Sequence, residues 1–134
     1  MAEAYISNGM LRPCEKKHRG VSTNPTSYKS NLVKGMKYPQ EFYGPVVKDK
    51  LRKIVQKHYT GQLKKHGENY LHFIIRTKMF GADDDLEILI IQERREIHFR
   101  SVARKFWDFG RNKKRVEKIK EFFEQEIRSQ KSSI

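Results

Sequence analysis

The spacing of apolar residues along the chain predicts two amphipathic helices. Between Pro45 and Tyr59 apolar residues recur at three- and four-residue steps, while lysine and arginine occupy the other side, which is the pattern of a half-buried helix. Pro45 suits the first turn because its missing N–H needs no partner there. A second helix is predicted from about Arg111 to Ser129, with a stripe of Val, Ile and Phe at helical spacing.

Between these helices the apolar residues alternate with polar ones at a period of two, which is typical of half-buried strands. The three clearest strands are Tyr70–Lys78, Leu86–Glu93 and Glu96–Arg104. Shorter strands are expected at Gln62–Lys65 and between Leu32 and Tyr38, where Pro39 ends the run.

The order of these elements predicts the fold class. Residues 1–30 contain Gly, Pro, Ser and Thr with little periodicity, so we expect an irregular N-terminal arm, followed by a single domain over residues 31–134. The expected fold is α+β, in the order β-α-β-β-β-α. It consists of an antiparallel sheet of three to five strands with both helices packed on one face.

Side-chain alternation assigns the sheet residues to two faces. A tight turn at Arg94–Arg95 would pair Glu93 with Glu96 and place Leu89 opposite Arg100. In that arrangement one face is almost wholly apolar and packs against the helices, and the other stays uncovered. The charged and histidine side chains on the uncovered face are His72, Arg76, Lys78, Asp85, Glu87, His98, Arg100 and Arg104.

The uncovered face is the first candidate site. Arginine side chains recognise carboxylates and phosphates through paired N–H groups, and neighbouring acids hold them in position. Arg100, Arg104, Asp85 and Glu87 therefore predict binding of a small anionic ligand or of a partner's acidic segment. The alternative is a solvated face with ordinary surface ion pairs, which carry little functional meaning.

The formal net charge of +13 favours acidic partners in general. Nucleic acid is one alternative, because the start of the second predicted helix is strongly basic and follows Trp107. The residues that would carry it are Arg111, Lys113, Lys114 and Lys118. No apolar run approaches the length of a membrane span, and Met1–Met10 does not resemble a secretory signal, so we expect a soluble intracellular protein.

No motif of a known reaction is present, so whether the protein is an enzyme stays open. Gly-rich phosphate loops, nucleophile elbows and paired-histidine zinc motifs are absent from the sequence. Cys14 is the single cysteine, which excludes an internal disulfide. We expect no cofactor and no metal site, although Asp84, Asp85 and Glu87 leave a hard-cation enzyme as an alternative.

Three segments resemble the DUF1499 family, a family of unknown function. These segments are Val21–Thr23, Phe80–Glu87 and Arg100–Arg115, and the similarity runs in order from about residue 20 to residue 124. The polar residues that match the family pattern are Asp84, Asp85, Glu87, Arg100, Ser101, Arg104, Asp108, Asn112 and Arg115. Two departures from the pattern are Ala103, in place of a second Ser, and Gly20, in place of a Cys.

The resemblance implies no particular activity, but it extends the candidate site. With it, the expected ligand-binding residues are Asp85, Glu87, Arg100, Ser101, Arg104 and Arg115. Asp84, Asp108 and Asn112 are expected to support the loop and cap the last helix.

Overall fold

The computed structural model describes residues 6–7, 9–78, 81–105 and 107–132. Within them, two helices pack against a mainly antiparallel sheet, so the predicted α+β class is confirmed. The elements are β1 (Ile6–Ser7), β2 (Met10–Leu11), β3 (Gly20–Ser22), β4 (Met36–Lys37), α1 (Gly44–His58), β5 (Gly61–Gly67), β6 (Tyr70–Arg76), β7 (Asp83–Ile91), β8 (Glu96–Ala103) and α2 (Arg111–Ser132). Both predicted helices are present, and α2 continues three residues beyond its expected end.

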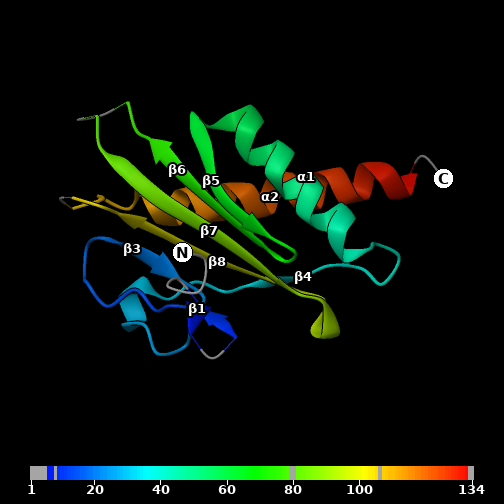
Figure 1. The fold of residues 1–134 in the computed structure, drawn as a ribbon, viewed down its shortest axis with the longest axis horizontal. Coiled ribbons are helices and arrows are strands. Elements are labelled where there is room, and N and C mark those ends of the chain that lie inside the picture. The colour runs from blue at the N-terminus through cyan, green and yellow to red at the C-terminus, as the bar shows by residue number, and fades with distance from the viewer. Residues whose placement is uncertain (1–5, 8, 79–80, 106, 133–134) are drawn as a thin grey trace.

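The main sheet has the strand order β3-β8-β7-β6-β5, and β4 pairs with the same edge of β8 as β3 does. Every pair of neighbouring strands is antiparallel. The sheet is one strand larger than the predicted upper limit of five, because Gly20–Ser22 of the N-terminal segment joins it. β1 and β2 form a separate hairpin, which is not paired with the strands of the sheet (Figure 1).

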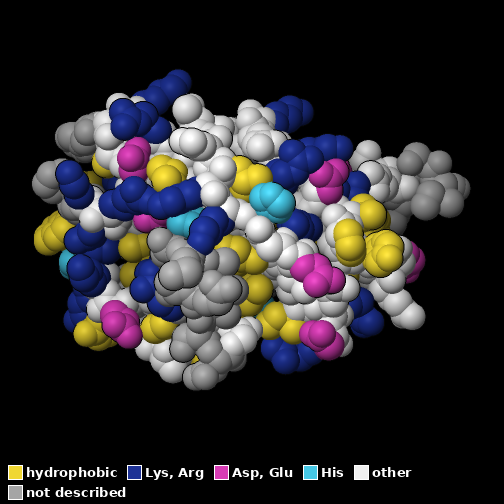
Figure 2. Space-filling model, in the orientation of Figure 1, with side chains coloured by type: hydrophobic (Ala, Val, Ile, Leu, Met, Phe, Trp, Pro, Cys, Tyr) yellow, Lys and Arg dark blue, Asp and Glu magenta, His cyan; other side chains and the backbone are white. Residues whose placement is uncertain are grey.

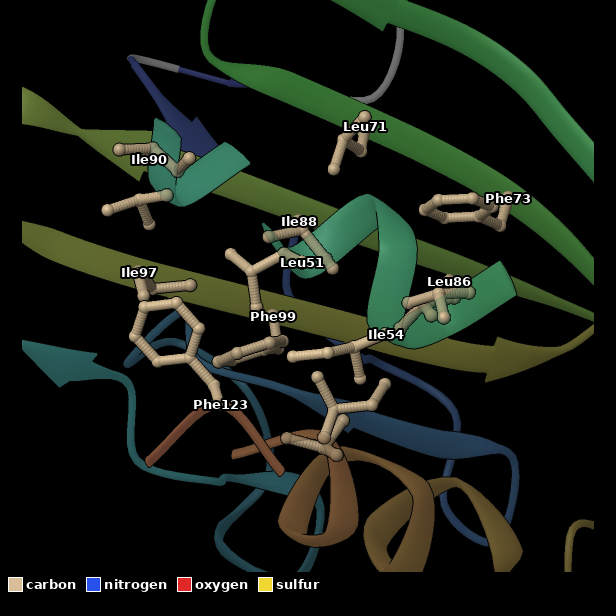
Figure 3. Packing of buried hydrophobic residues seen from close by; sticks show 14 of the residues in the cluster. Leu51, Ile54, Leu71, Phe73, Leu86, Ile88, Ile90, Ile97, Phe99 and Phe123 are labelled. Carbon is tan, nitrogen blue, oxygen red and sulfur yellow. The ribbon is translucent and has the colours of Figure 1, made fainter. Parts of the chain in front are cut away.

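Both helices lie on one face of the sheet, where α2 crosses behind the strands (Figure 1). Leu51 and Ile54 of α1 and Phe123 of α2 enter a core whose other side is formed by the inward residues of β6, β7 and β8 (Figure 3). Each such side chain contributes about 1.5–3 kcal/mol when it is fully buried. Among the described residues no helix is long and apolar enough to cross a membrane.

The predicted turn at Arg94–Arg95 is wrong, and the register of β7 on β8 changes with it. Gln92–Arg94 form a single 3₁₀ turn and Arg95 takes a left-handed conformation with φ +51°. Ile91 therefore pairs with Glu96, and Glu87 lies opposite Arg100. Because the shift equals two residues, every side chain keeps its predicted face.

The second face of the sheet was expected to be uncovered, and this is wrong in part. Leu11 of β2 packs on Tyr70 and Leu89 there, with Ile91 beside them, to form a small second core. Burial of these apolar side chains explains why the N-terminal segment lies across the sheet.

Candidate functional site

The outer face of the sheet carries two ion pairs that connect β7 with β8 and the residue after it. Arg104 donates two hydrogen bonds to the carboxylate of Asp85, from Nε at 2.9 Å and Nη2 at 3.0 Å. Arg100 Nη1 donates to Glu87 Oε2 at 2.9 Å. The structure thus brings together four of the six residues expected to bind a ligand.

A tyrosine and a histidine complete these two pairs. The Tyr70 hydroxyl donates to Glu87 Oε1 at 2.6 Å, and His72 Nε2 lies 2.8 Å from Asp85 Oδ1. Burial raises the pKa of Asp85, but the hydrogen bonds from His72 and Arg104 outweigh burial and hold this pKa well below its usual range. Asp85 is therefore ionised at neutral pH and suits an arginine partner better than the role of a proton donor.

A second polar cluster lies on the inner face, under the start of α2. Asp84 is fully buried and accepts two hydrogen bonds from Arg111, at 2.8 and 2.6 Å, and one from Arg115 at 2.9 Å. The hydrogen bonds that Arg111 donates to Asp84 raise the pKa of Arg111. Arg115 is also buried, and its guanidinium lies 5.5 Å from the centre of the Tyr59 ring. One carboxylate thus joins β7 to two successive turns of α2.

Ser101 and Asn112 extend this inner cluster to the loop before α2. Ser101 Oγ donates to Asn112 Oδ1 at 2.6 Å, and Arg115 Nη1 donates to the same oxygen at 2.7 Å. The Asn112 amide donates to Asp108 Oδ2 at 3.0 Å, while Asp108 Oδ1 accepts the backbone N–H of Gly110 at 3.0 Å. Asp108 therefore satisfies backbone donors at the start of the helix, the usual function of an aspartate in this place.

The sequence-derived set is divided between the two faces. Asp85, Glu87, Arg100 and Arg104 lie outside, whereas Ser101 and Arg115 lie inside with the three residues expected to support the loop and the helix. Residues 84 and 85, like residues 100 and 101, are neighbours in one strand, so their side chains point in opposite directions. Phe80, in one segment of the family resemblance, is outside the described residues.

The four residues of the nucleic-acid alternative also lie in different surroundings. Arg111 is bound to Asp84, while Lys113 and Lys114 are exposed on the first turn of α2. Lys118 Nζ lies 3.7 Å from Glu121.

Sequence reasoning missed a cleft between the N-terminal segment and β8, which we call the arm cleft. It has a volume of about 330 Å³. It is lined by Arg12, Pro13, Cys14, Glu15, Lys16, Arg19, Arg100, Val102 and Ala103. Four cationic side chains and one carboxylate thus surround it. The available signal was the basic run around Cys14, but its position against β8 depends on tertiary contacts.

Cys14 lies in the wall of the arm cleft as a buried thiol. Burial raises the pKa of Cys14, although a backbone hydrogen bond with Lys16 and the nearby Arg100 oppose the change. Because the thiolate is the reactive form, this thiol is not activated at neutral pH.

A comparison with protein families accounts for most of the chain. The family described as "Protein of unknown function (DUF1499)" matches residues 10–123. The chain belongs to the DUF1499 family. The match covers both polar clusters and also the N-terminal segment that forms the arm cleft. Searches of curated proteins and of solved structures give no match.

Proposed function

We propose that this DUF1499 protein is a non-catalytic binding module that holds a small anionic ligand, or an acidic segment of a partner, in the arm cleft. The observation that carries the proposal is the charge of the lining: Arg12, Lys16, Arg19 and Arg100 against the single carboxylate of Glu15. A concave site with several cations of this kind favours phosphate or carboxylate groups.

Two of the four cations are held in place by other parts of the fold. Arg100 uses Nη1 for Glu87 and Nε for the Pro13 carbonyl, at 3.4 Å. Arg19 donates from Nε and Nη2 to the Ala103 carbonyl, at 3.2 and 3.0 Å. In the described part of the chain, Nη2 of Arg100 and Nη1 of Arg19 form no hydrogen bond. Such prearranged donors lower the entropic cost of binding.

The size of the cleft limits the ligand. About 330 Å³ is near the lower end of small-molecule sites. A phosphomonoester or a small dicarboxylate fits this volume and matches the charge. An ion pair on the outer face of the sheet supports the arm cleft, because the Glu87 carboxylate holds the guanidinium of Arg100 in position. The positive net charge of the chain would speed capture of any anion.

The two alternatives have less support. Nucleic-acid binding loses one of its four predicted residues, because the Arg111 guanidinium is occupied by Asp84. A hard-cation enzyme would need the acids of β7 to converge. Instead Asp84 and Asp85 point to opposite faces and each is bound by arginine.

A thermal-shift and calorimetric series tests the proposal. Inorganic phosphate, phosphomonoesters and dicarboxylates should raise the melting temperature, because ligands that bind the native state alone stabilise it. The variant Arg12→Gln/Lys16→Gln should remain folded and lose the shift. Lys57→Gln/Lys64→Gln, which removes the same charge at exposed positions elsewhere, should keep it.

Two results would overturn the proposal. One is a flat melting temperature with every anion of the series. The other is an equal loss of affinity in both double variants, since that result would assign binding to net charge and leave the cleft without a role.

A further inference from the structure

The loop between β8 and α2 presents two aromatic rings to solvent. Trp107 is 58% exposed and Phe109 is 72% exposed, the largest fraction among the exposed large apolar side chains of the described residues. Their ring centres are 6.2 Å apart, and Trp107 also stacks on His18 at 4.5 Å. We call His18, Trp107 and Phe109 the aromatic tip.

The aromatic tip is held by backbone conformation and by a buried anchor. Phe109 has φ +53°, a left-handed conformation that is unfavourable for a residue other than glycine. Between the two rings, Asp108 is buried and its backbone N–H donates to the His18 carbonyl at 2.7 Å. Its carboxylate accepts the N–H of Gly110. Strain of this kind persists only where the surroundings maintain it, and it often marks a functional segment.

The aromatic tip lies at a strongly cationic end of the molecule. Lys105, Lys113 and Lys114 are exposed within the same loop and the first turn of α2. Arg76 and Lys78 lie at the same end of the sheet, since Arg76 pairs with Asp83 at the start of β7. Lysine and arginine gather at this end of the molecule in Figure 2, at the left.

We propose that the aromatic tip docks this protein on the surface of an anionic lipid bilayer. Tryptophan and phenylalanine rings enter the boundary between head groups and acyl chains, and nearby lysines are attracted to anionic head groups. An exposed phenylalanine that the fold maintains in a strained turn has no role in the core, whereas a bilayer gives it an apolar environment.

The ring geometry favours a bilayer over single-stranded nucleic acid. Bases stack on an open aromatic face. One face of Trp107 is covered by His18, and Phe109 is tilted by 58° to the Trp107 ring. The two rings therefore offer no parallel faces on which successive bases could stack. The proposal also involves residues other than those of the arm cleft, so it can be tested independently of the anion site.

Trp107 is the single tryptophan of the chain, which makes its fluorescence a direct probe of the tip. The full chain is mixed with vesicles of phosphatidylcholine alone or of phosphatidylcholine with phosphatidylglycerol. We expect a blue shift, protection from acrylamide and co-sedimentation with the anionic vesicles, all weakened by salt.

Variants separate the aromatic from the electrostatic contribution. Phe109→Ser should weaken vesicle binding by about tenfold while it keeps the Trp107 signal. Each of Lys105→Gln, Lys113→Gln and Lys114→Gln should weaken it by roughly fivefold. Tyr43→Ser, at an exposed aromatic ahead of α1, should have no effect.

The proposal fails if anionic vesicles leave the Trp107 spectrum unchanged, or if Phe109→Ser and Tyr43→Ser behave alike. It also fails if oligonucleotides quench Trp107 while bilayers do not, since that outcome would assign the aromatic tip to nucleic acid.

Discussion

Removal of the negative charge at Asp84 should destabilise the protein strongly. Asp84→Asn keeps the shape of the side chain but leaves Arg115, which is 7% exposed, without a counter-charge. Loss of one partner of a buried pair costs about 3–5 kcal/mol. We expect the lower end, about 3 kcal/mol, because asparagine can still accept a hydrogen bond. For a domain of this size the melting temperature should fall by roughly 10 °C.

Urea unfolding followed by circular dichroism measures this loss. Asp83→Asn is the matched control, because the Asp83 carboxylate is 30% exposed and lies 3.4 Å from the mostly exposed Arg76. It should cost less than about 0.5 kcal/mol. Asp84→Asn/Arg115→Met should recover part of the loss, since it removes the buried Arg115 charge and leaves only Arg111, whose side chain is 20% exposed, without its carboxylate. A single variant within about 1 kcal/mol of wild type would refute the reasoning.

Three further predictions concern other parts of the fold. The pKa of Asp85 is lowered in the folded state, so its stabilisation is complete above the unfolded pKa and is lost as pH falls through the folded pKa. Asp85→Asn should therefore reduce the acid dependence of the urea midpoint between about pH 5 and about pH 2, and an unchanged slope would contradict this. Gly20→Ala should cost about 2 kcal/mol or more in urea unfolding, because its Cβ would lie 2.2 Å from the Ser101 carbonyl oxygen; wild-type stability would contradict that clash. Cys14 should react with maleimide much more slowly in the native than in the urea-unfolded protein, and equal rates would show that the thiol is exposed.

The sequence was sufficient for the fold class and for the faces of the central strands. The helical spacing of three and four residues and the strand period of two residues are both local signals. A register shift of two residues, moreover, cannot move a side chain to the other face of the sheet. The turn was mistaken because the left-handed Arg95 is stabilised from outside the hairpin, where the Tyr38 N–H donates to its carbonyl at 3.0 Å. No local pattern reports such a contact.

The candidate site was predictable only where it depends on strand alternation. The local sequence around Asp84 is typical of a turn, whereas its burial depends on Arg111 and Arg115, which project from one side of α2 and bind its carboxylate. The arm cleft depends on contacts across many residues. One example is the Asn24 amide, which donates to the Leu11 carbonyl at 2.8 Å. An aperiodic segment gives no signal for contacts of this kind.

The most direct test of the proposed function is the location of anion binding on the folded protein. An NMR titration of the full chain with inorganic phosphate should move the backbone amide signals of the segments 12–19 and 100–103, which line the arm cleft. Shifts confined to the lysines of α1, or no saturable shift in either segment, would contradict an anion site between the N-terminal segment and β8.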